Sequence, residues 1–430
     1  MKIKKIIRKR LAIFGIMTFM FMSISCVYAN QDNVKSENLE TLPQETSDQV
    51  KTDPEKLPHT PDTNTPKTSQ KAMESLPEKA ESDKSKEVEI PGKEQSGIEK
   101  EEKIRPSIKI AAPFSRHEER YQKLFETLET GGMSQKRIKQ IFSSQRAKIK
   151  DDAPVQRMSK KVIRQASMRP KKQVRQIVRK IKRHIKKNKK SYDRLEKKYG
   201  VNREVAASIL FKETCLGEFK SWKHESFTVL NSILSFMDLP KQGPRKKRAE
   251  RILSTAQKSL EELLLYCNDH NIDILKKEFP SSFAGAVGIP QFMPMYMDYV
   301  ITDKKNSIPN LSRMPDAILS LGNLMKNNFD WPGKMSLNKL KSIDDIFRKY
   351  VEYDKQKGVS FCMAEDLEGT PLKRFVDDYK KIPHIDYISD YAGVLMSYNY
   401  SSNYVLDVLH LAYHTHKLKS DKPSKKKRKI

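Results

Sequence analysis

The chain has 430 residues, of which 83 are Lys or Arg and 54 are Asp or Glu, and its formal net charge is +29. Hydrophobic residues make up 37% and charged residues 32%, a balance too polar for a chain that is packed along its whole length. No apolar run beyond the N-terminus could span a membrane, which excludes a polytopic transporter, and four Cys exclude a disulfide-dense scaffold.

Residues 1–29 have the pattern of a signal peptide or membrane anchor. Six Lys and Arg precede the apolar stretch 11–25, and Val27-Tyr28-Ala29 offers a cleavage point before Asn30. Two alternatives stay open: Cys26 as an acylated lipoprotein Cys, and an uncleaved anchor over residues 11–29, which is close to spanning length. We therefore expect an exported protein of the periplasm or cell envelope, with or without membrane association.

Residues 30–112 are predicted to form a disordered, charged linker that contains Pro. Residues 30–106 hold no Phe, Trp or Tyr, eight Pro, and 18 acidic against 12 basic residues. Such a composition buries too little apolar surface to offset the entropy of ordering. Residues 107–430 consequently carry a net charge of +29, which predicts a polyanionic partner.

Residues 113–418 are predicted to form one mainly α catalytic domain, because helical periodicity dominates and few segments alternate. We expect Asn202 to cap a helix that Gly217 stops. Between Arg146 and Gly200 stand 22 Lys and Arg against four acids, which indicates either a solvated helix surface or a face that steers a polymer. The predicted helices are Lys171–Lys198, Arg203–Leu216, Ala256–Tyr266, Pro315–Asn327 and Asn403–His414.

Glu213 is the first candidate catalytic residue. It continues the apolar face of the helix after Asn202, and burial of a carboxyl group raises its pKa, as a general acid near neutral pH requires. Taken alone, a Glu near a helix end more often reaches solvent or an Arg. A second candidate feature, Ser281–Pro294, is a stretch of small residues with two Gly. Such a stretch suits either close approach of a ligand or a tight helix crossing; Ser282 and Gln291 add neutral hydrogen-bonding groups suited to sugars.

Together these segments resemble the lytic murein transglycosylases, specifically their membrane-bound B type. Glu213-Thr214-Cys215-Leu216-Gly217 is similar to the family's Glu-Ser/Thr-x-x-Gly motif, and Ser282–Pro294 is similar to its Ser-Phe-Ala-Gly-Ala-x-Gly-x-x-Gln-Phe-Met-Pro segment. Two further segments follow in the family's order, Pro315–Ile318 with Trp331 and Tyr398–Ser401 with Tyr404.

The resemblance implies a lysozyme-like α-helical catalytic domain with an additional helical subdomain. It implies cleavage of the glycan strand of peptidoglycan between N-acetylmuramic acid and N-acetylglucosamine, with 1,6-anhydro ends. Glu213 would be the sole catalytic acid and base. Substrate-binding residues would be Ser282, Gln291, Tyr398 and Asn399.

Three other functions remain as alternatives. A hydrolytic muramidase would use water in place of the sugar's own hydroxyl, and a non-catalytic cationic wall-binding protein would use the domain as a scaffold. Nucleic acid is not expected as a partner of an exported chain, although the basic tail 419–430 mimics a nuclear-localisation patch.

No cofactor and no metal ion are expected. Where many members of the family carry a calcium loop, this chain has Lys304, Lys305 and Ser312-Arg313, and calcium requires several oxygen ligands without adjacent cations. No spacing of the His residues is taken as a metal-ligand pattern, and His414 and His416 are expected to face solvent. Cys215 is expected to be a small buried residue. A disulfide between Cys267 and Cys362 is left open.

Overall fold

The computed structural model describes residues 117–147, 152, 154–156, 166–219, 222–242, 244–357 and 385–418. These residues belong to one of the chain's two compact units; the other, residues 37–106, lies outside the described residues. The predicted signal or anchor, linker and basic tail likewise fall outside them. No helix within the described part of the chain is long and apolar enough to cross a membrane.

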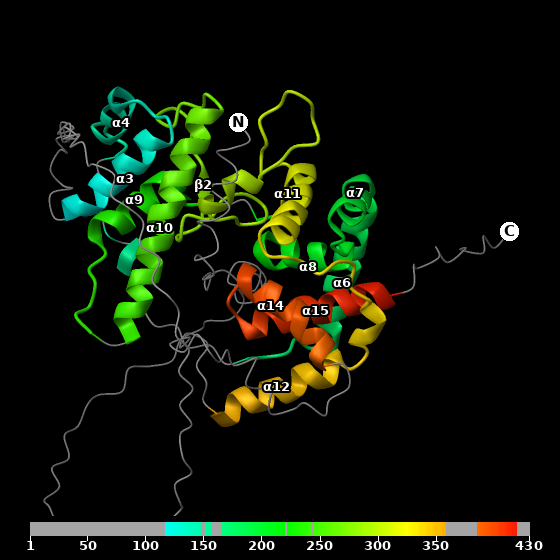
Figure 1. The fold of residues 1–430 in the computed structure, drawn as a ribbon. Coiled ribbons are helices and arrows are strands. Elements are labelled where there is room, and N and C mark those ends of the chain that lie inside the picture. Colours follow the sequence, from blue (N-terminus) through cyan, green and yellow to red (C-terminus); the bar gives the residue numbers. More distant parts are fainter. Residues whose placement is uncertain are drawn as a thin grey trace, which may run out of the picture. The chain divides into compact units, whose positions relative to one another are not determined.

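Helices dominate the described residues, which confirms the predicted mainly α fold class (Figure 1). The only regular strands within the described ranges are two short ones that pair antiparallel, with His224 opposite Ser281. The elements are α3 (Glu118–Thr130), α4 (Gln135–Phe142), α6 (Lys171–Lys187), α7 (Lys189–Tyr199), α8 (Arg203–Thr214), β1 (His224–Glu225), α9 (Ser226–Phe236), α10 (Pro244–Asp269), β2 (Pro280–Ser281), η3 (Pro294–Tyr299), α11 (Met314–Asn327), η4 (Leu337–Leu340), α12 (Ile343–Lys357), α14 (Ile385–Tyr398) and α15 (Ser402–Lys417).

The helix predicted over Lys171–Lys198 is two helices, α6 and α7, which meet at Asn188. The side chain of Asn188 donates a hydrogen bond of 3.1 Å to the carbonyl of His184, and Ser191 donates its backbone N–H to the carbonyl of Asn188. Asn competes with regular helical bonding in this way, which accounts for the break. The apolar positions of α6 are nevertheless buried as the periodicity predicts: Val174, Ile177, Val178, Ile181 and Ile185.

Helix α8 is buried on all sides, because every residue from Val205 to Thr214 is in the core. It packs against α6, α7, α11 and α15. Asn202 precedes the helix, but its side chain forms no capping hydrogen bond. Its side chain instead donates to the carbonyl of Met335 at 2.9 Å and accepts from the Met335 N–H at 2.7 Å. The predicted N-cap position of Asn202 and the start of the helix are therefore confirmed, whereas the capping hydrogen bond from its side chain is not formed.

A second group of helices consists of α3, α4, α9 and α10 (Figure 1). Tyr121 of α3 is fully buried there, and its hydroxyl bonds to the side chains of Asn231 and Ser235 of α9. The short helix η3 contacts both α10 and α11, so it joins this group to the helices around α8. The segment 281–294, which carries Ser282 and Gln291, leads directly into η3.

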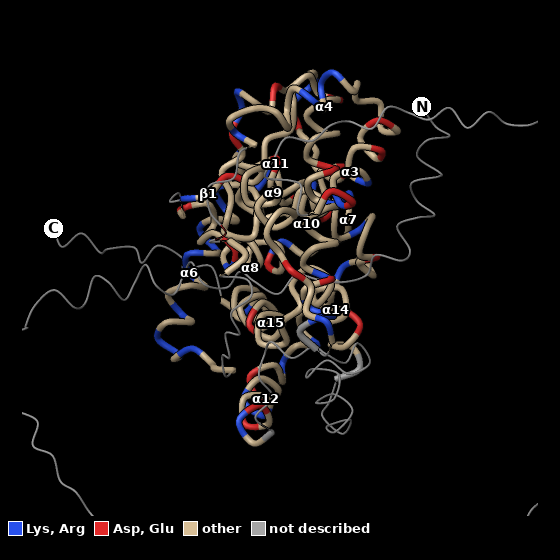
Figure 2. Tube along the Cα trace, turned by 90° about the vertical axis from the view of Figure 1, so that its left-hand side faces the viewer, with Lys and Arg blue, Asp and Glu red and all other residues tan. Residues whose placement is uncertain are grey.

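Helix α6 is rich in Lys and Arg (Figure 2), and most of these residues are exposed. Within the described residues, Lys180 is the one cation of α6 that forms an ion pair, with Glu218. Acids are absent from the first turn of the helix. The exposed cations of α6 are Lys171, Lys172, Arg175, Arg179, Arg183, Lys186 and Lys187.

Candidate active site

Glu213 lies at the end of the buried helix α8 and is only 3% exposed. The helix ends one residue later, because Cys215 and Leu216 adopt left-handed backbone angles, φ 52° and 67°, before Gly217 at φ 81°. Left-handed angles at two residues other than Gly are strained and recur at functional sites. The predicted stop at Gly217 is therefore two residues late, and this sharp turn fixes the position of Glu213.

The carboxyl group of Glu213 has one direct partner among the described side chains, Tyr404 of α15. The Tyr404 hydroxyl donates a hydrogen bond of 2.6 Å to Oε1 of Glu213. Tyr404 is fully buried, and its own N–H donates to the hydroxyl of Ser401, which caps α15. A capped helix and a packed ring therefore hold the donor in place.

Burial raises the pKa of Glu213 to about 8, although the hydrogen bond from Tyr404 and the charge of Lys212 oppose this shift. The carboxyl group is therefore protonated at neutral pH, as a general acid must be. Burial and the nearby Glu213 together raise the pKa values of Tyr398 and Tyr404 well above the usual range of a phenol. Both tyrosines consequently remain neutral hydrogen-bond donors.

A buried ionic group joins α8 to α15 beside the candidate acid. Nζ of Lys212 lies 2.7 Å from Oδ2 of Asp407, and Arg169 also pairs with Asp407. Burial would raise the pKa of Asp407, but Lys212 and Arg169 hold it below its usual value. Because Lys212 precedes Glu213 and Asp407 lies one turn after Tyr404, this group fixes the two helices that carry the Glu213–Tyr404 pair.

The segment 281–294 folds into two tight turns. Val287 forms antiparallel bridges with both Ser281 and Phe292. Gly288 has a left-handed φ of 72°, and a Cβ at this position would lie 2.3 Å from Cβ of Leu311 and 2.9 Å from its carbonyl oxygen. Only glycine therefore fits here, and the close approach is to the neighbouring backbone of residue 311.

Two hydrogen bonds attach this segment to the surroundings of Glu213. The hydroxyl of Thr214 donates to the carbonyl of Ile289 at 2.8 Å, and the hydroxyl of Tyr398 donates to the carbonyl of Pro290. Thr214 is the residue after Glu213, so the segment is tied directly to the end of α8. This arrangement brings Gln291 and Tyr398 to the neighbourhood of the candidate acid.

Gln291 has an unsatisfied acceptor. Its Nε2 donates to the carbonyl of Gly288 at 2.7 Å, whereas its Oε1 is buried and has no hydrogen-bond partner among the described residues. The backbone of Gln291 is left-handed, with φ 52°. A buried acceptor without a partner is costly, so this oxygen is suited to accept a hydrogen bond from a bound ligand.

Ser282 and Asn399 are buried nearby but lack a direct contact with Glu213 among the described hydrogen bonds. The hydroxyl oxygen of Ser282 accepts from the N–H groups of Ala284 and Ala286, at 3.3 and 3.2 Å, and so shapes the first turn of the segment. The carbonyl of Asn399 accepts from the Ser401 N–H at 2.6 Å, next to the cap of α15. Their binding roles stay predictions.

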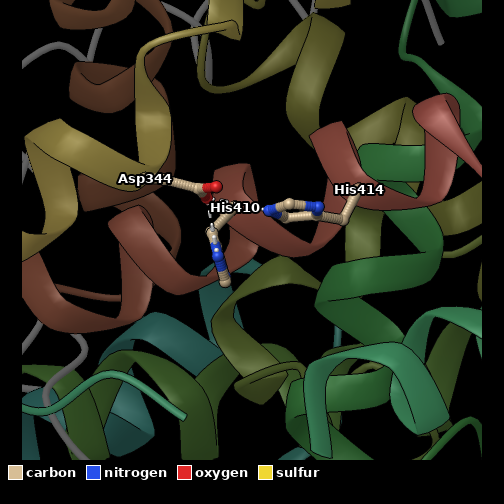
Figure 3. Close-up of side chains that lie close together, drawn as sticks. All are labelled: Asp344, His410 and His414. Carbon is tan, nitrogen blue, oxygen red and sulfur yellow. Dashed lines mark hydrogen bonds and ion pairs between the residues drawn. The ribbon is translucent and has the colours of Figure 1, made fainter. Parts of the chain in front are cut away.

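The structure adds residues that the sequence did not single out. The sequence pattern offered no role for Lys212 or Asp407, whose pairing spans 195 positions. The expectation that His414 faces solvent holds only in part, because its side chain is partly exposed while its Nε2 lies 2.8 Å from Oδ1 of Asp344 (Figure 3). His416 is exposed, as expected. His410 joins the same carboxylate, and the spacing of His410 and His414 by four positions is a signal in the sequence itself.

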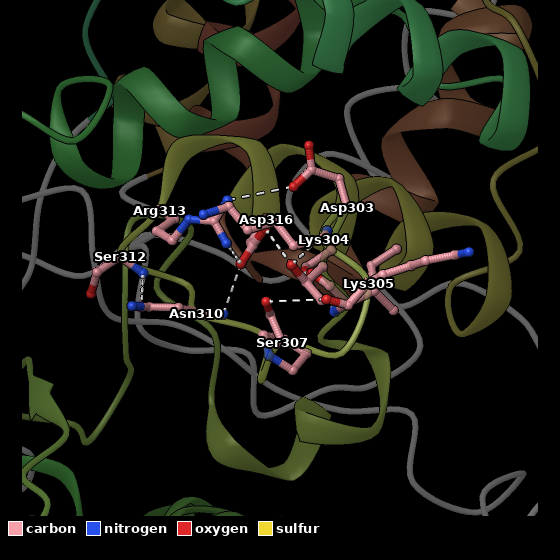
Figure 4. Close-up of polar contacts among 12 residues, drawn as sticks. Asp303, Lys304, Lys305, Ser307, Asn310, Ser312, Arg313 and Asp316 are labelled. Carbon is pink, nitrogen blue, oxygen red and sulfur yellow. Dashed lines mark hydrogen bonds and ion pairs between the residues drawn. The ribbon is translucent and has the colours of Figure 1, made fainter.

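In the loop at the position of the family's calcium site, hydrogen-bond donors of the protein itself surround the carboxylate of Asp316 (Figure 4). The fully buried carboxylate of Asp316 accepts from the hydroxyl of Thr302 at 3.1 Å and from the N–H of Asn310 at 2.9 Å. Nη1 of Arg313 lies 3.1 Å from the same carboxylate and supplies a positive charge there. A guanidinium at this position does not fit a calcium ion; the absence of calcium stays a prediction.

The cysteines differ from expectation. Cys267 is a free, buried thiol, so the disulfide with Cys362 that the sequence left open is not formed in the structure. Burial raises the pKa of Cys267 to about 12, which makes its thiol unreactive at neutral pH. Cys215 is half-buried and disulfide-bonded, and is therefore not the small buried thiol that we expected. Cys26 and Cys362 lie outside the described residues.

Comparison with known proteins gives one family match, to the transglycosylase SLT domain, over residues 116–413. No curated protein matches the chain. Similar solved structures include the Escherichia coli lytic transglycosylase SLT35 in complex with bulgecin A, at 17% identity, with 71% of this chain and 95% of that chain covered and a TM-score of 0.46. The catenated lytic transglycosylase SltB1 from Pseudomonas aeruginosa is 19% identical, with 71% and 98% covered and a TM-score of 0.46. SltB3 from the same organism, in complex with NAG-anhNAM-pentapeptide, is 16% identical, with 70% and 80% covered and a TM-score of 0.44.

Proposed function

The chain belongs to the transglycosylase SLT domain family, and from this premise we propose that Glu213 is the single acid and base of its reaction. Membership identifies an enzyme that cleaves peptidoglycan as a lytic transglycosylase, as the sequence predicted. The observation that supports the role of Glu213 is its protonated carboxyl group, buried at the end of α8 and bonded to the neutral hydroxyl of Tyr404.

The first step is cleavage of the bond between N-acetylmuramic acid and N-acetylglucosamine. Glu213 donates its proton to the glycosidic oxygen as the bond from that oxygen to C1 breaks, and an oxocarbenium-like centre develops at C1. The carboxylate that remains is stabilised by the hydrogen bond from Tyr404 and by the charge of Lys212, the two influences that lower the pKa of Glu213. Glu213 is thereby able to serve in the second step as a base.

The second step closes a ring within the sugar. Glu213 takes the proton of the C6 hydroxyl of the muramic acid, and the C6 oxygen forms a bond to C1, so that a 1,6-anhydro end results and no water is consumed. A second carboxylate is not needed, because Glu213 acts first as the acid and then as the base. Burial, Tyr404 and Lys212 are the main influences on its pKa. Ser282, Gln291, Tyr398 and Asn399 would line the site near the reacting sugar.

Digestion of purified sacculi followed by mass spectrometry tests this reaction. We expect muropeptides lighter by one water than reducing ends, and we expect them to resist borohydride reduction. Reducing ends would instead identify a hydrolytic muramidase. The Glu213→Gln protein is the control: if it and the wild type bind sacculi equally and neither releases product, the chain is a non-catalytic wall-binding protein.

We further propose that the enzyme is exported and acts in the periplasm or cell envelope, as a relative of the membrane-bound B type. The support is in the sequence, namely the basic and apolar residues 1–29 and the linker that follows them. Expression of the full chain followed by membrane and periplasmic fractionation tests the proposal. Loss of membrane association in Cys26→Ala, together with fatty-acid labelling of the wild type, would identify a lipoprotein; a wholly cytosolic chain would contradict export.

A further inference from the structure

Three side chains from two helices converge near the start of α12 (Figure 3). Asp344 lies in the first turn of α12, and His410 and His414 lie one turn apart on α15. Nε2 of His410 is 3.0 Å, and Nε2 of His414 is 2.8 Å, from the same oxygen, Oδ1 of Asp344. All three potential ligand atoms lie within 4.8 Å of one another.

The ligand set has the chemistry of a zinc-class site. Imidazole nitrogen and carboxylate oxygen are preferred ligands of Zn²⁺ and of neighbouring transition metals, and two His residues four positions apart lie on one face of a helix. Ligands about 2.0–2.2 Å from a tetrahedral ion are roughly 3.3 Å from each other. The distances of 2.8 and 3.0 Å to Asp344 are slightly shorter than this spacing, and the two imidazole nitrogens lie within 4.8 Å of each other, so small side-chain adjustments would be needed to place all three atoms around one ion.

The surroundings hold the ligands in place and leave access to solvent. The side chain of His410 is 5% exposed, and its ring stacks edge-to-face with Phe347 at 5.7 Å. The side chains of Asp344 and His414 are 44% and 32% exposed, so an ion can enter from solvent and keep a water ligand.

The cluster is incompletely satisfied by the protein's own groups. Nδ1 of His410 is buried and has no hydrogen-bond partner among the described residues. Both imidazole Nε2 atoms are directed at one carboxylate oxygen, an arrangement that a shared cation would also satisfy. The alternative is a purely structural hydrogen-bonded cluster that joins α12 to α15.

We propose that Asp344, His410 and His414 form a binding site for one Zn²⁺ ion. The ion would join α12 to α15, the helix that also carries Tyr404, and it would take no part in the chemistry of Glu213. The proposal does not depend on the proposed reaction, because its test measures metal binding rather than cleavage.

Metal titration of the full chain, stripped with a chelator, tests the proposal. We expect one Zn²⁺ per chain by calorimetry, a rise in Tm on addition of Zn²⁺, and the visible absorption of four-coordinate Co²⁺ on substitution. We expect His414→Gln and Asp344→Asn to bind Zn²⁺ at least about tenfold more weakly. Calcium and magnesium should neither bind at this site nor raise Tm through it, since both ions prefer oxygen ligands.

His416→Gln is the matched control, because His416 is exposed on the same helix and lies outside the cluster. It should bind Zn²⁺ as the wild type does. The proposal is overturned if the wild type takes up no stoichiometric Zn²⁺ or Co²⁺, or if His414→Gln binds as tightly as His416→Gln. Circular dichroism of each variant establishes that it is folded; should His414→Gln unfold, Asp344→Asn, whose side chain is partly exposed, provides the same comparison.

Discussion

The hydroxyl of Tyr404 donates a hydrogen bond of 2.6 Å to Oε1 of Glu213, across 191 positions of the sequence. The pair has two opposing effects on one carboxyl group. Burial favours the protonated form, which can donate a proton, and the hydrogen bond favours the ionised form, which can accept one. A carboxyl group under both influences is suited to serve first as an acid and then as a base.

Substitution of Tyr404 by Phe should move the pH profile of the enzyme. The pKa of Glu213 should rise above its present value of about 8, because the donor that stabilises the carboxylate is lost. A hydrogen bond to a charged group contributes about 1.5–3 kcal/mol, so kcat should fall roughly 10- to 100-fold. Kinetics on sacculi between pH 5 and pH 10 would measure both effects. Tyr413→Phe makes the same change on α15 and should keep the wild-type profile; an unshifted alkaline limb in Tyr404→Phe would contradict the assignment.

Glu213 should make the protein less stable as the pH rises. Its pKa is raised from 4.5 to about 8 in the folded state, so between these values the folded protein retains a proton that the unfolded chain releases. The free energy of unfolding contributed by this group is therefore full below about pH 4.5 and falls as the pH rises to about 8. Glu213→Gln removes this dependence and should be more stable than the wild type by a few kcal/mol at pH 8, while kcat falls by about 10²–10⁴-fold.

Urea unfolding of both proteins across this pH range measures the effect. The two unfolding midpoints should approach each other near pH 4.5 and separate as the pH rises. Parallel pH dependence in the two proteins would show that Glu213 is not protonated in the folded state, and the role of a general acid would then be wrong.

The sequence predicted well those features that depend on the residues of a single helix. The start of α8 at Arg203 and the burial of the apolar stripe of α6 follow from periodicity alone. The positions at which helices break or end did not follow from periodicity. The break at Asn188 and the left-handed turn at Cys215 depend on side-chain hydrogen bonds and on backbone angles that residue type does not prescribe.

The residues of the candidate site likewise fall into those that the sequence predicted and those that it did not. Glu213 and the glycine-rich segment were visible in the sequence, because each is contiguous and has its own pattern. Tyr404 belonged to a family-like segment, but its contact with Glu213 was not predicted, and Asp407 had no signal at all, since both reach α8 only when α15 packs against it. The His410–Asp344 contact depends likewise on the packing of α12 against α15. Contacts between helices distant in sequence leave no periodic signal in a single chain.

Substitution of Gly288 by Ala should damage both folding and activity. The new Cβ would lie 2.3 Å from Cβ of Leu311 and near its backbone, and φ at this position is 72°. The backbone must then shift, which moves Gln291 away from the site; we expect a clear fall in Tm and in kcat/KM. Gly393→Ala is the matched control, since nothing lies within 4 Å of its Cβ, and in helix α14 it should raise stability by about 0.5–1 kcal/mol. Equal behaviour of the two variants would show that residue 288 tolerates a side chain.

Substitution of Asp407, the carboxylate shared by Lys212 and Arg169, should destabilise the protein more than substitution of Lys212. Asp407→Asn leaves Lys212 and Arg169 without their common carboxylate, and loss of one partner from a buried pair costs about 3–5 kcal/mol. Lys212→Met should cost less, because the Asp407–Arg169 pair remains. Denaturant unfolding at neutral pH measures the order, and a larger loss in Lys212→Met than in Asp407→Asn would contradict this description of the group.

The basic face of α6 should steer the enzyme toward the anionic wall. Arg175, Arg179 and Arg183 recur every four residues and are exposed, so they lie on one side of the helix. Replacing all three with Gln should weaken binding of the Glu213→Gln protein to sacculi at low salt by roughly tenfold, and should reduce the salt dependence of binding. A triple Gln variant at scattered exposed lysines removes the same charge and should have a smaller effect. If both variants weaken binding equally, net charge decides the affinity; if neither does, the face is merely solvated. The scattered positions for this control are Lys123, Lys276 and Lys341, which are exposed and lie far apart in the sequence.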